Sequence, residues 1–281
     1  MKTLGLNFHQ TFKPERNCLN SLLMDLDECT GKTASEISKV TGIPTGVSSG
    51  KVVPTILYLE YMGLIKEQSA NKSYQLEYTS LGESVKEEDP GLIENLTLLL
   101  LHCMISRKVS GAPLWSYIIC ELLPKYHGEI RKANFDKELE MKFGKEVSIS
   151  PFNGTYTGIF EQIDILSVSN NGYKMCGHPV NTEYMYVYAY ILYEYWKEWA
   201  STFSEAEKEK CNISETEITS DQIAATGFRD PFGWSSKEEY QVLEALHDSG
   251  VIVLNRQMTP FTVRKVASRE EIIDLLYSNL C

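Results

Sequence analysis

The stretch Thr33-Ala-Ser-Glu-Ile-Ser-Lys-Val-Thr-Gly42 begins the pattern that decides the fold. Thr33 is a preferred N-cap residue, and Glu36 stands three residues later, where it completes a capping box. Gly42 is the residue type that most often ends a helix in the left-handed conformation. We therefore predict a short helix between Thr33 and Gly42.

A second helix and a hairpin follow this first helix. Residues 51–61 carry apolar side chains at helical spacing. Residues 74–78 alternate like a strand after Gly63-Leu64-Ile65 and a polar stretch. Helix, turn, helix and two-stranded wing is the order of a winged helix-turn-helix. The sequence predicts such a unit, together with an N-terminal segment, over residues 1–90.

The same order of elements recurs twice more, less regularly. Residues 129–176 contain a helical stretch at 134–143 and the hairpin turn Asn170-Asn171-Gly172. Residues 204–281 contain a helical stretch at 236–247 followed by two strand-like runs. Repeats of this length usually form stacked modules. We expect a second and a third winged-helix-like unit in these two regions.

The central region, residues 91–203, surrounds the second unit with helices. Residues 92–106 are apolar almost all round, which predicts a buried central helix. Residues 183–203 are rich in tyrosine and tryptophan, whose polar tips need partners when they are buried. The expected fold is mainly α with small β wings, an α+β fold of winged helix-turn-helix units around a central helical core.

The charge balance limits the contacts with nucleic acid. The chain of 281 residues has 27 Lys and Arg against 38 Asp and Glu, a net charge of -11. This argues against a protein that coats nucleic acid through its global charge, so any DNA contact must be local. The seven cysteines are scattered without a Cys-x-x-Cys pair, and no signal peptide or bilayer-spanning run is visible. We expect a cytoplasmic protein with no membrane partner.

Candidate DNA contacts lie in the first winged helix. Ser48, Ser49 and Lys51 precede the second helix, where backbone N–H groups, hydroxyls and an ammonium would face a phosphate. Thr55 one turn later and Lys72 in the wing complete the candidate set. The alternative is a helix cap alone, because glutamates offset these lysines locally and many winged helices bind only proteins.

The sequence offers no clear metal or cofactor site. The five histidines are dispersed, and none is paired with another at the spacing of a helical metal site. No nucleophile elbow is visible either. We predict no metal, no cofactor and no identifiable catalytic residue from these patterns.

The N-terminal segment Phe8-His9-Gln-Thr11-Phe12 with Arg16 is of a different kind. It combines a histidine, a hydroxyl, two aromatic rings and an arginine ahead of the first helix. One interpretation is structural, with Phe8 and Phe12 pinned against the winged helix and His9 bonded to the backbone. The other is a polar cluster that meets a ligand or nucleic acid.

Several motifs together resemble those of a known bacterial family. They are Phe8-His9-Gln10-Thr11-Phe12 with Arg16, Gly46-Val47, Gly63-Leu64-Ile65, Leu76-x-x-Thr79-x-Leu81-Gly82-x-x-Val85, Glu88-Asp89-Pro90-Gly91-Leu92 and Leu99-Leu100-Leu101-His102. The family is a domain-of-unknown-function family found beside genes for DNA phosphorothioation. It includes the SspB component of Ssp-type antiphage systems, which is credited with DNA nicking. The resemblance covers about the first 115 residues.

The resemblance implies a DNA-modification or defence context and carries over His9, Thr11, Phe12 and Arg16 as motif residues. This chain has Gln10 where the family usually has glutamate, and Ser48-Ser49 where it has Gly-Lys.

We expect an accessory component that binds DNA through a winged helix and acts with other components of a defence operon. The alternative is a protein scaffold without nucleic-acid contact. Its aromatic segment, residues 184–199, would meet an operon partner or a second copy in a homodimer. A further alternative is a metal-dependent DNA nickase.

Overall fold

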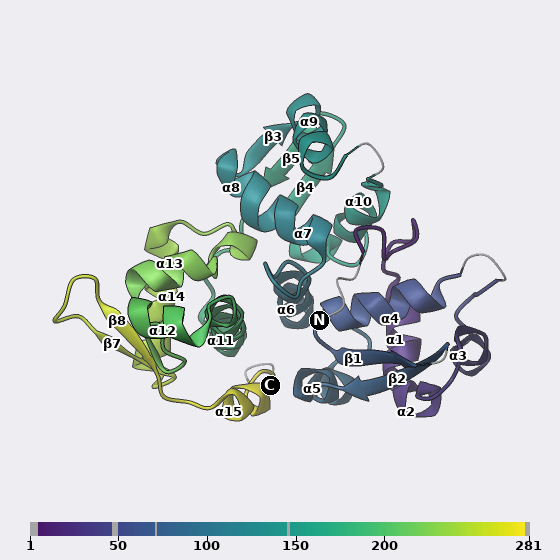
Figure 1. Cartoon of the computed structure of the whole chain (residues 1–281), viewed down its shortest axis with the longest axis horizontal. Coiled ribbons are helices and arrows are strands. Elements are labelled where there is room, and N and C mark those ends of the chain that lie inside the picture. The colour runs from purple at the N-terminus through teal and green to yellow at the C-terminus, as the bar shows by residue number, and fades with distance from the viewer. Residues whose placement is uncertain (1–4, 47–49, 71, 145–146, 279–281) are drawn as a thin grey trace.

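The computed structural model describes residues 5–46, 50–70, 72–144 and 147–278. Ser48 and Ser49 lie outside these residues. Helices dominate the described part, and three small antiparallel sheets complete it. Figure 1 shows three units placed around helix α6. The predicted α+β class is therefore confirmed.

The first unit holds the predicted helix, turn, helix and hairpin. Its elements are α1 (Arg16–Met24), α2 (Leu26–Cys29), α3 (Ala34–Thr41), α4 (Val52–Tyr61), β1 (Ile65–Ala70), β2 (Ser73–Tyr78) and α5 (Ser80–Glu88). The capping box of Thr33 and Glu36 forms as predicted, and Gly42 ends α3 with a φ of 71°. The strands β1 and β2 pair antiparallel, and a single bridge joins Lys32 to Tyr74.

The second unit has a strand in front of its two helices. Its elements are α7 (Pro113–Tyr117), a π-helical turn η1 (Ile118–Leu122), α8 (Leu123–Lys125), β3 (Glu129–Arg131), α9 (Lys132–Phe143), α10 (Ser150–Tyr156), η2 (Glu161–Ile163), β4 (Leu166–Ser169) and β5 (Gly172–Met175). The order across its sheet is β3-β5-β4, so the last strand lies in the middle. The predicted hairpin turn joins β4 to β5.

The third unit repeats that arrangement. Its elements are η3 (Thr182–Tyr184), α11 (Met185–Ser201), α12 (Glu205–Cys211), β6 (Glu217–Thr219), α13 (Ser220–Thr226), η4 (Asp230–Phe232), α14 (Ser236–Asp248), β7 (Ile252–Asn255), β8 (Thr262–Lys265) and α15 (Arg269–Asp274). Its sheet order, β6-β8-β7, matches that of the second unit. In both units the chain runs strand, helix, helix, hairpin, and in the first unit the leading strand is reduced to the Lys32 bridge.

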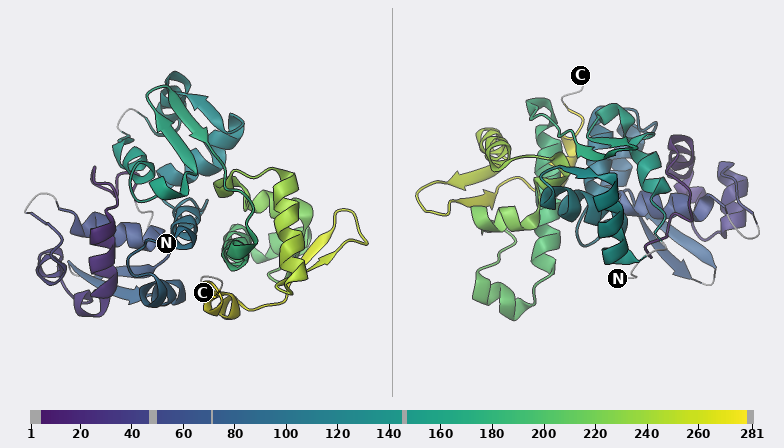
Figure 2. Two further views of the ribbon diagram at one scale, coloured as in Figure 1. Left: turned by 180° about the vertical axis from the view of Figure 1, so that it is seen from behind. Right: turned by 90° about the horizontal axis from the view of Figure 1, so that it is seen from above.

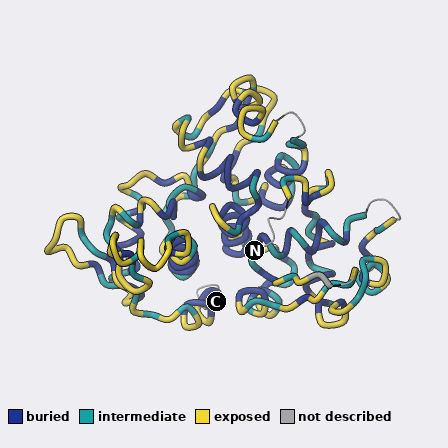
Figure 3. The backbone as a smooth tube through the Cα atoms, viewed as in Figure 1, coloured by how far each residue is buried: buried dark blue, intermediate teal, exposed yellow. Residues whose placement is uncertain are grey.

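The central helix α6 (Asn95–Ile105) is buried on every side. Every residue from Leu96 to Ile105 is buried, which confirms the predicted buried helix. Figure 3 shows this helix in the buried colour between the units. Within the described residues, no helix is both long enough and apolar enough to cross a bilayer.

The aromatic helix α11 turns its side chains inward. All residues from Val187 to Trp196 are buried. The predicted polar partners of the aromatic tips lie within the chain: the Tyr195 hydroxyl donates to the carbonyl of Cys103 at 2.9 Å, and the Trp196 indole to that of Ser214 at 2.8 Å. The expectation that residues 184–199 present a partner surface is wrong for this buried stretch, because the core of the third unit already covers it.

His102 joins three parts of the molecule from its place on α6. Its Nε2 lies 2.9 Å from the carbonyl oxygen of Pro231, and its Nδ1 lies 3.0 Å from the hydroxyl of Tyr156. A carbonyl oxygen only accepts hydrogen bonds, so Nε2 carries the proton and Nδ1 accepts from the tyrosine. Burial lowers the pKa of His102 to about 4. The neutral ring therefore holds the second and third units against the central helix.

Candidate functional site

The N-terminal segment lies between the first and second units, beside α4 and α10 (Figure 1). The hydroxyl of Tyr58, on α4, donates to the carbonyl of Phe12 at 2.9 Å. On the other side, a guanidinium nitrogen of Arg16 donates to Gln162 at 3.3 Å. The motif residues thus connect two units that are far apart in the sequence.

Phe8 anchors this segment. Its ring is 6% exposed and lies 4.6 Å from the ring of Tyr61, 4.9 Å from that of Tyr58 and 5.9 Å from that of Trp115, measured between centroids. The first two contacts have edge-to-face geometry, which aromatic pairs prefer. The structural interpretation of Phe8 is therefore correct, whereas Phe12 is only half-buried and contributes its carbonyl.

His9 is buried, neutral and only partly satisfied. It is 1% exposed, and its Nδ1 accepts a hydrogen bond from the backbone N–H of Thr11 at 3.1 Å. Burial lowers its pKa to about 4, so at neutral pH the single proton sits on Nε2. Nε2 has no hydrogen-bond partner among the described residues. A buried donor left in this state costs about 1–3 kcal/mol.

The backbone at this point is held in an uncommon conformation. Gln10 and Thr11 have φ values of 46° and 72°, in the left-handed region that few non-glycine residues adopt. This conformation lets the Thr11 N–H turn back to His9. Thr11 itself is exposed. The bond from Thr11 to His9 thus fixes which ring nitrogen keeps the proton.

Lys13 is a residue of this site that the sequence patterns did not single out. Its side chain crosses α10 at Gly154, and its ammonium lies near Gly158 in the turn that follows the helix. A Cβ on Gly154 would lie 2.8 Å from Cδ of Lys13, so the glycine admits the lysine chain. The spacing of the two glycines was the available signal. Lys13 and Arg16 bring two positive charges to this seam.

The candidate DNA contacts of the first unit are less accessible than expected. Thr55 is 4% exposed, and its hydroxyl donates to the carbonyl of Lys51. This burial corrects the expectation that Thr55 touches DNA. The Lys51 ammonium lies 2.7 Å from a carboxylate oxygen of Glu15, so a phosphate would compete with that ion pair. Lys72 stands exposed in the β1–β2 turn.

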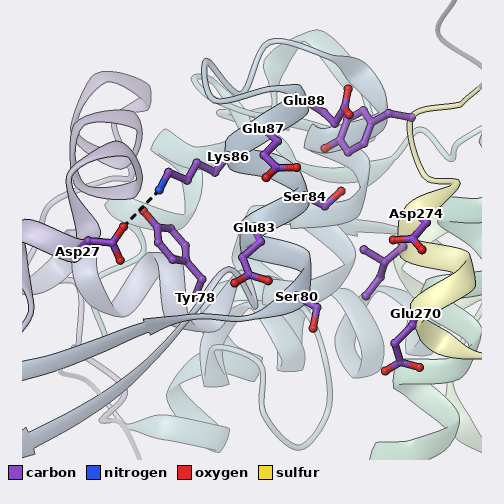
Figure 4. A pocket seen from close by; sticks show the side chains of 12 residues that line it. Asp27, Tyr78, Ser80, Glu83, Ser84, Lys86, Glu87, Glu88, Glu270 and Asp274 are labelled. Atoms are coloured by element: carbon purple, nitrogen blue, oxygen red, sulfur yellow. Dashed lines mark ion pairs between the residues drawn. The ribbon is translucent and has the colours of Figure 1, made fainter.

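An acidic groove lies between α5 and α15 (Figure 4), with a cavity volume of about 620 Å³. Its carboxylates belong to Asp27, Glu83, Glu87, Glu88, Glu270 and Asp274. Lys86 is the cation of this lining; it lies 3.5 Å from Asp27 and 4.4 Å from the centre of the Tyr78 ring. The groove would repel a phosphate backbone. In the described part of the chain, no three His, Cys, Asp or Glu side chains are grouped so that they could hold a metal ion.

The chain is similar in fold to solved structures. No protein-family model matches the sequence, and no curated protein matches it. A crystal structure of magnesium-ion-bound SspB superposes with a TM-score of 0.66 at 16% identity, over 98% of this chain and 86% of that chain. The chain has the SspB fold. A second SspB crystal structure gives a TM-score of 0.62 at 14% identity over the same shares.

The likeness to SspB extends the resemblance seen in the sequence. The sequence motifs covered about the first 115 residues, whereas the SspB fold accounts for 98% of the chain. At this identity the agreement lies in the arrangement of elements. The predicted resemblance to SspB-like proteins is confirmed at the level of the fold.

Proposed function

We propose that this protein is an SspB-like component of a DNA phosphorothioation-linked antiphage defence system and that it engages DNA. The observation that carries the proposal is the SspB fold over 98% of the chain. The N-terminal residues that carry the resemblance also support it, because they lie at the seam between the first and second units.

We also propose that the three units are winged helices. The order strand, helix, helix, hairpin supports this assignment for the second and third units, as does the central position of the last strand in each sheet. The same helical pair and hairpin in the first unit support it there. Winged helices commonly engage duplex DNA by placing a helix in the major groove.

The acidic charge of the chain limits which residues can contact DNA. With a net charge of -11, only a local group of cations can contact the duplex. Phosphate contacts then position the protein, while base contacts add specificity. A partner from the same operon would add positive charge and strengthen the complex.

Fluorescence anisotropy with a short labelled duplex, phosphorothioated or unmodified, tests the DNA proposal. We expect binding whose log affinity falls linearly with log salt, with a slope of about -0.9 for each neutralised phosphate. Added salt together with an excess of unlabelled duplex should displace the labelled duplex from the protein. Absence of binding at micromolar protein, or an affinity that ignores salt, would refute the proposal.

A protein scaffold is the second candidate, and the acidic groove favours it. Six carboxylates against one lysine around one cavity suit a basic protein segment better than a nucleic acid. Light scattering of the protein with and without the other operon products, beside a mobility-shift assay, separates the two candidates. A defined complex or oligomer without any DNA shift would favour the scaffold.

DNA nicking stays a further alternative without assigned residues. The SspB crystal structure is described as magnesium-bound. Among the described residues of this chain, no group of three or more His, Cys, Asp or Glu side chains could hold a metal ion, and no residue is assigned to magnesium. Conversion of supercoiled plasmid to open circle, lost in a His9→Phe or Arg16→Gln variant, would revive this alternative.

A further inference from the structure

The second helices of the three units differ in what covers them. In the first unit, every residue of α4 from Val52 to Tyr61 is buried or half-buried. In the second unit, α10 exposes Ser150, but Lys13 of the N-terminal segment crosses it at Gly154. Neither helix presents an open face that could enter a DNA groove.

The corresponding helix of the third unit, α14, keeps a polar face open. Ser236, Lys237, Gln241 and Asp248 are exposed, with Tyr240 and Glu244 half-buried beside them. These positions are spaced by three to four residues and so form one stripe along the helix. The helix has 13 residues, which makes the stripe about 20 Å long at 1.5 Å per residue. Serine, lysine and glutamine side chains are types that bind phosphates and base edges.

The hairpin of the third unit stands beside this stripe. Residues 255–260, which lead from β7 toward β8, are all exposed. Figure 2 shows the hairpin projecting from the body of the molecule. A hollow of about 400 Å³ separates it from the helices, lined by Tyr240, Arg256 and Met258 among others. The ring of Tyr240 contacts that of Phe261 at 5.5 Å, so helix and hairpin share one surface.

Two cations stand on this surface, Lys237 on the helix and Arg256 on the hairpin. Arg256 donates to Glu244 at 2.8 Å and lies 5.9 Å from the ring of Tyr240. A phosphate that binds Arg256 competes with this ion pair, as at Lys51. Lys237 has no ion-pair partner within the described ranges. The remaining carboxylates of this surface are Asp221 in the hollow and Asp248 at the end of the stripe, so the unpaired cation lies at the Lys237 end.

We propose that duplex DNA docks on α14 and the β7–β8 hairpin of the third unit. This inference rests on the proposed DNA function and names the surface that performs it. Lys237 and Arg256 contact phosphates, and Ser236 and Gln241 reach base edges. The first unit, where the sequence placed the DNA contacts, then serves the fold and the seam with the second unit.

Salt-dependent anisotropy on charge-neutralising variants tests the surface. Lys237→Gln and Arg256→Gln should each reduce the size of the salt slope by about 0.9, which at about 0.1 M salt is roughly an eightfold loss of affinity. Lys72→Gln, an exposed lysine of the first hairpin, is the matched control and should leave affinity within about twofold. Because all three side chains are exposed, circular dichroism should show folded proteins.

Two outcomes separate this inference from the function on which it rests. Wild-type protein that binds DNA with a salt slope, together with unchanged slopes in Lys237→Gln and Arg256→Gln, overturns the third-unit surface and leaves the DNA function standing. A loss confined to Lys72→Gln moves the surface to the first unit and likewise overturns the inference. Wild-type protein that shows no salt-dependent binding overturns both proposals.

Discussion

Replacing His9 by phenylalanine separates a role in the fold from a role in function. In the folded protein, Nδ1 of His9 accepts from the Thr11 N–H, while Nε2 is a buried donor without a partner in the described structure. Phenylalanine keeps the ring against Trp115, whose centroid lies 6.3 Å away. It removes both nitrogens.

The expected change in the free energy of unfolding follows from the loss of these two nitrogens. Losing the hydrogen bond from the Thr11 N–H to His9 costs about 0.5–1.5 kcal/mol. The cost stays in this range because Thr11 is exposed and its N–H can bond to water instead. Removing the unpartnered Nε2 donor recovers about 1–3 kcal/mol. We therefore expect His9→Phe to change the free energy of unfolding by between about 0 and 2 kcal/mol in the stabilising direction. His9→Ala, which also empties packing space, should cost about 2–4 kcal/mol.

Urea unfolding followed by tryptophan fluorescence measures both variants. The pH dependence adds a second readout: His9 has a pKa of about 4 when folded, against 6.5 as its ordinary value. The unfolded state therefore binds more protons between these values, so acidification through this window destabilises the wild type. In the His9→Phe variant, the part of this pH dependence of stability that comes from His9 should be absent. A His9→Phe protein destabilised by more than about 2 kcal/mol would refute the reasoning, because His9 would then serve the fold through its nitrogens.

Three further changes test other parts of the structure. Lys265→Met should stabilise the protein at neutral pH, because burial against the rings of Tyr193 and Trp196 lowers the Lys265 pKa to about 8. The free energy of unfolding of the wild type should therefore rise with pH between 8 and 10.5. Thermal unfolding of the variant should show no such rise. Tyr195→Phe removes the donor to the Cys103 carbonyl and should cost about 1 kcal/mol in urea unfolding; an unchanged midpoint would speak against that bond. Gly82→Ala would place a Cβ 1.8 Å from the Leu64 carbonyl oxygen and should prevent folding. Soluble yield and circular dichroism measure this. A folded variant would show that the two backbones can separate.

Local signals in the sequence predicted the first unit well. The capping box of Thr33 and Glu36 and the glycine at position 42 act within a few residues, so they determine α3 without help from the rest of the chain. The hairpin turn at Asn170 and Asn171 is equally local. Such features survive tertiary packing because they satisfy their own backbone groups.

Burial by distant segments could not be read in the same way. The helix α4 was expected to offer a face to DNA, yet the N-terminal segment and neighbouring aromatic rings cover it. Its nearly continuous apolar sequence was a signal of burial on more than one side. Lys13 contacts Gly154 across 141 positions of sequence; the spacing of Gly154 and Gly158 indicates a close approach but not which residue makes it. The same reason explains why the open face of α14 emerges only from the folded arrangement.

The salt dependence of duplex affinity tests the central claim most directly. The account predicts that the wild type binds a short duplex with log affinity falling linearly in log salt, and that neutralising Lys237 or Arg256 each removes about 0.9 from the slope. Binding of the wild type that does not respond to salt, or no binding at micromolar concentration, would contradict the claim that this SspB-fold protein engages DNA.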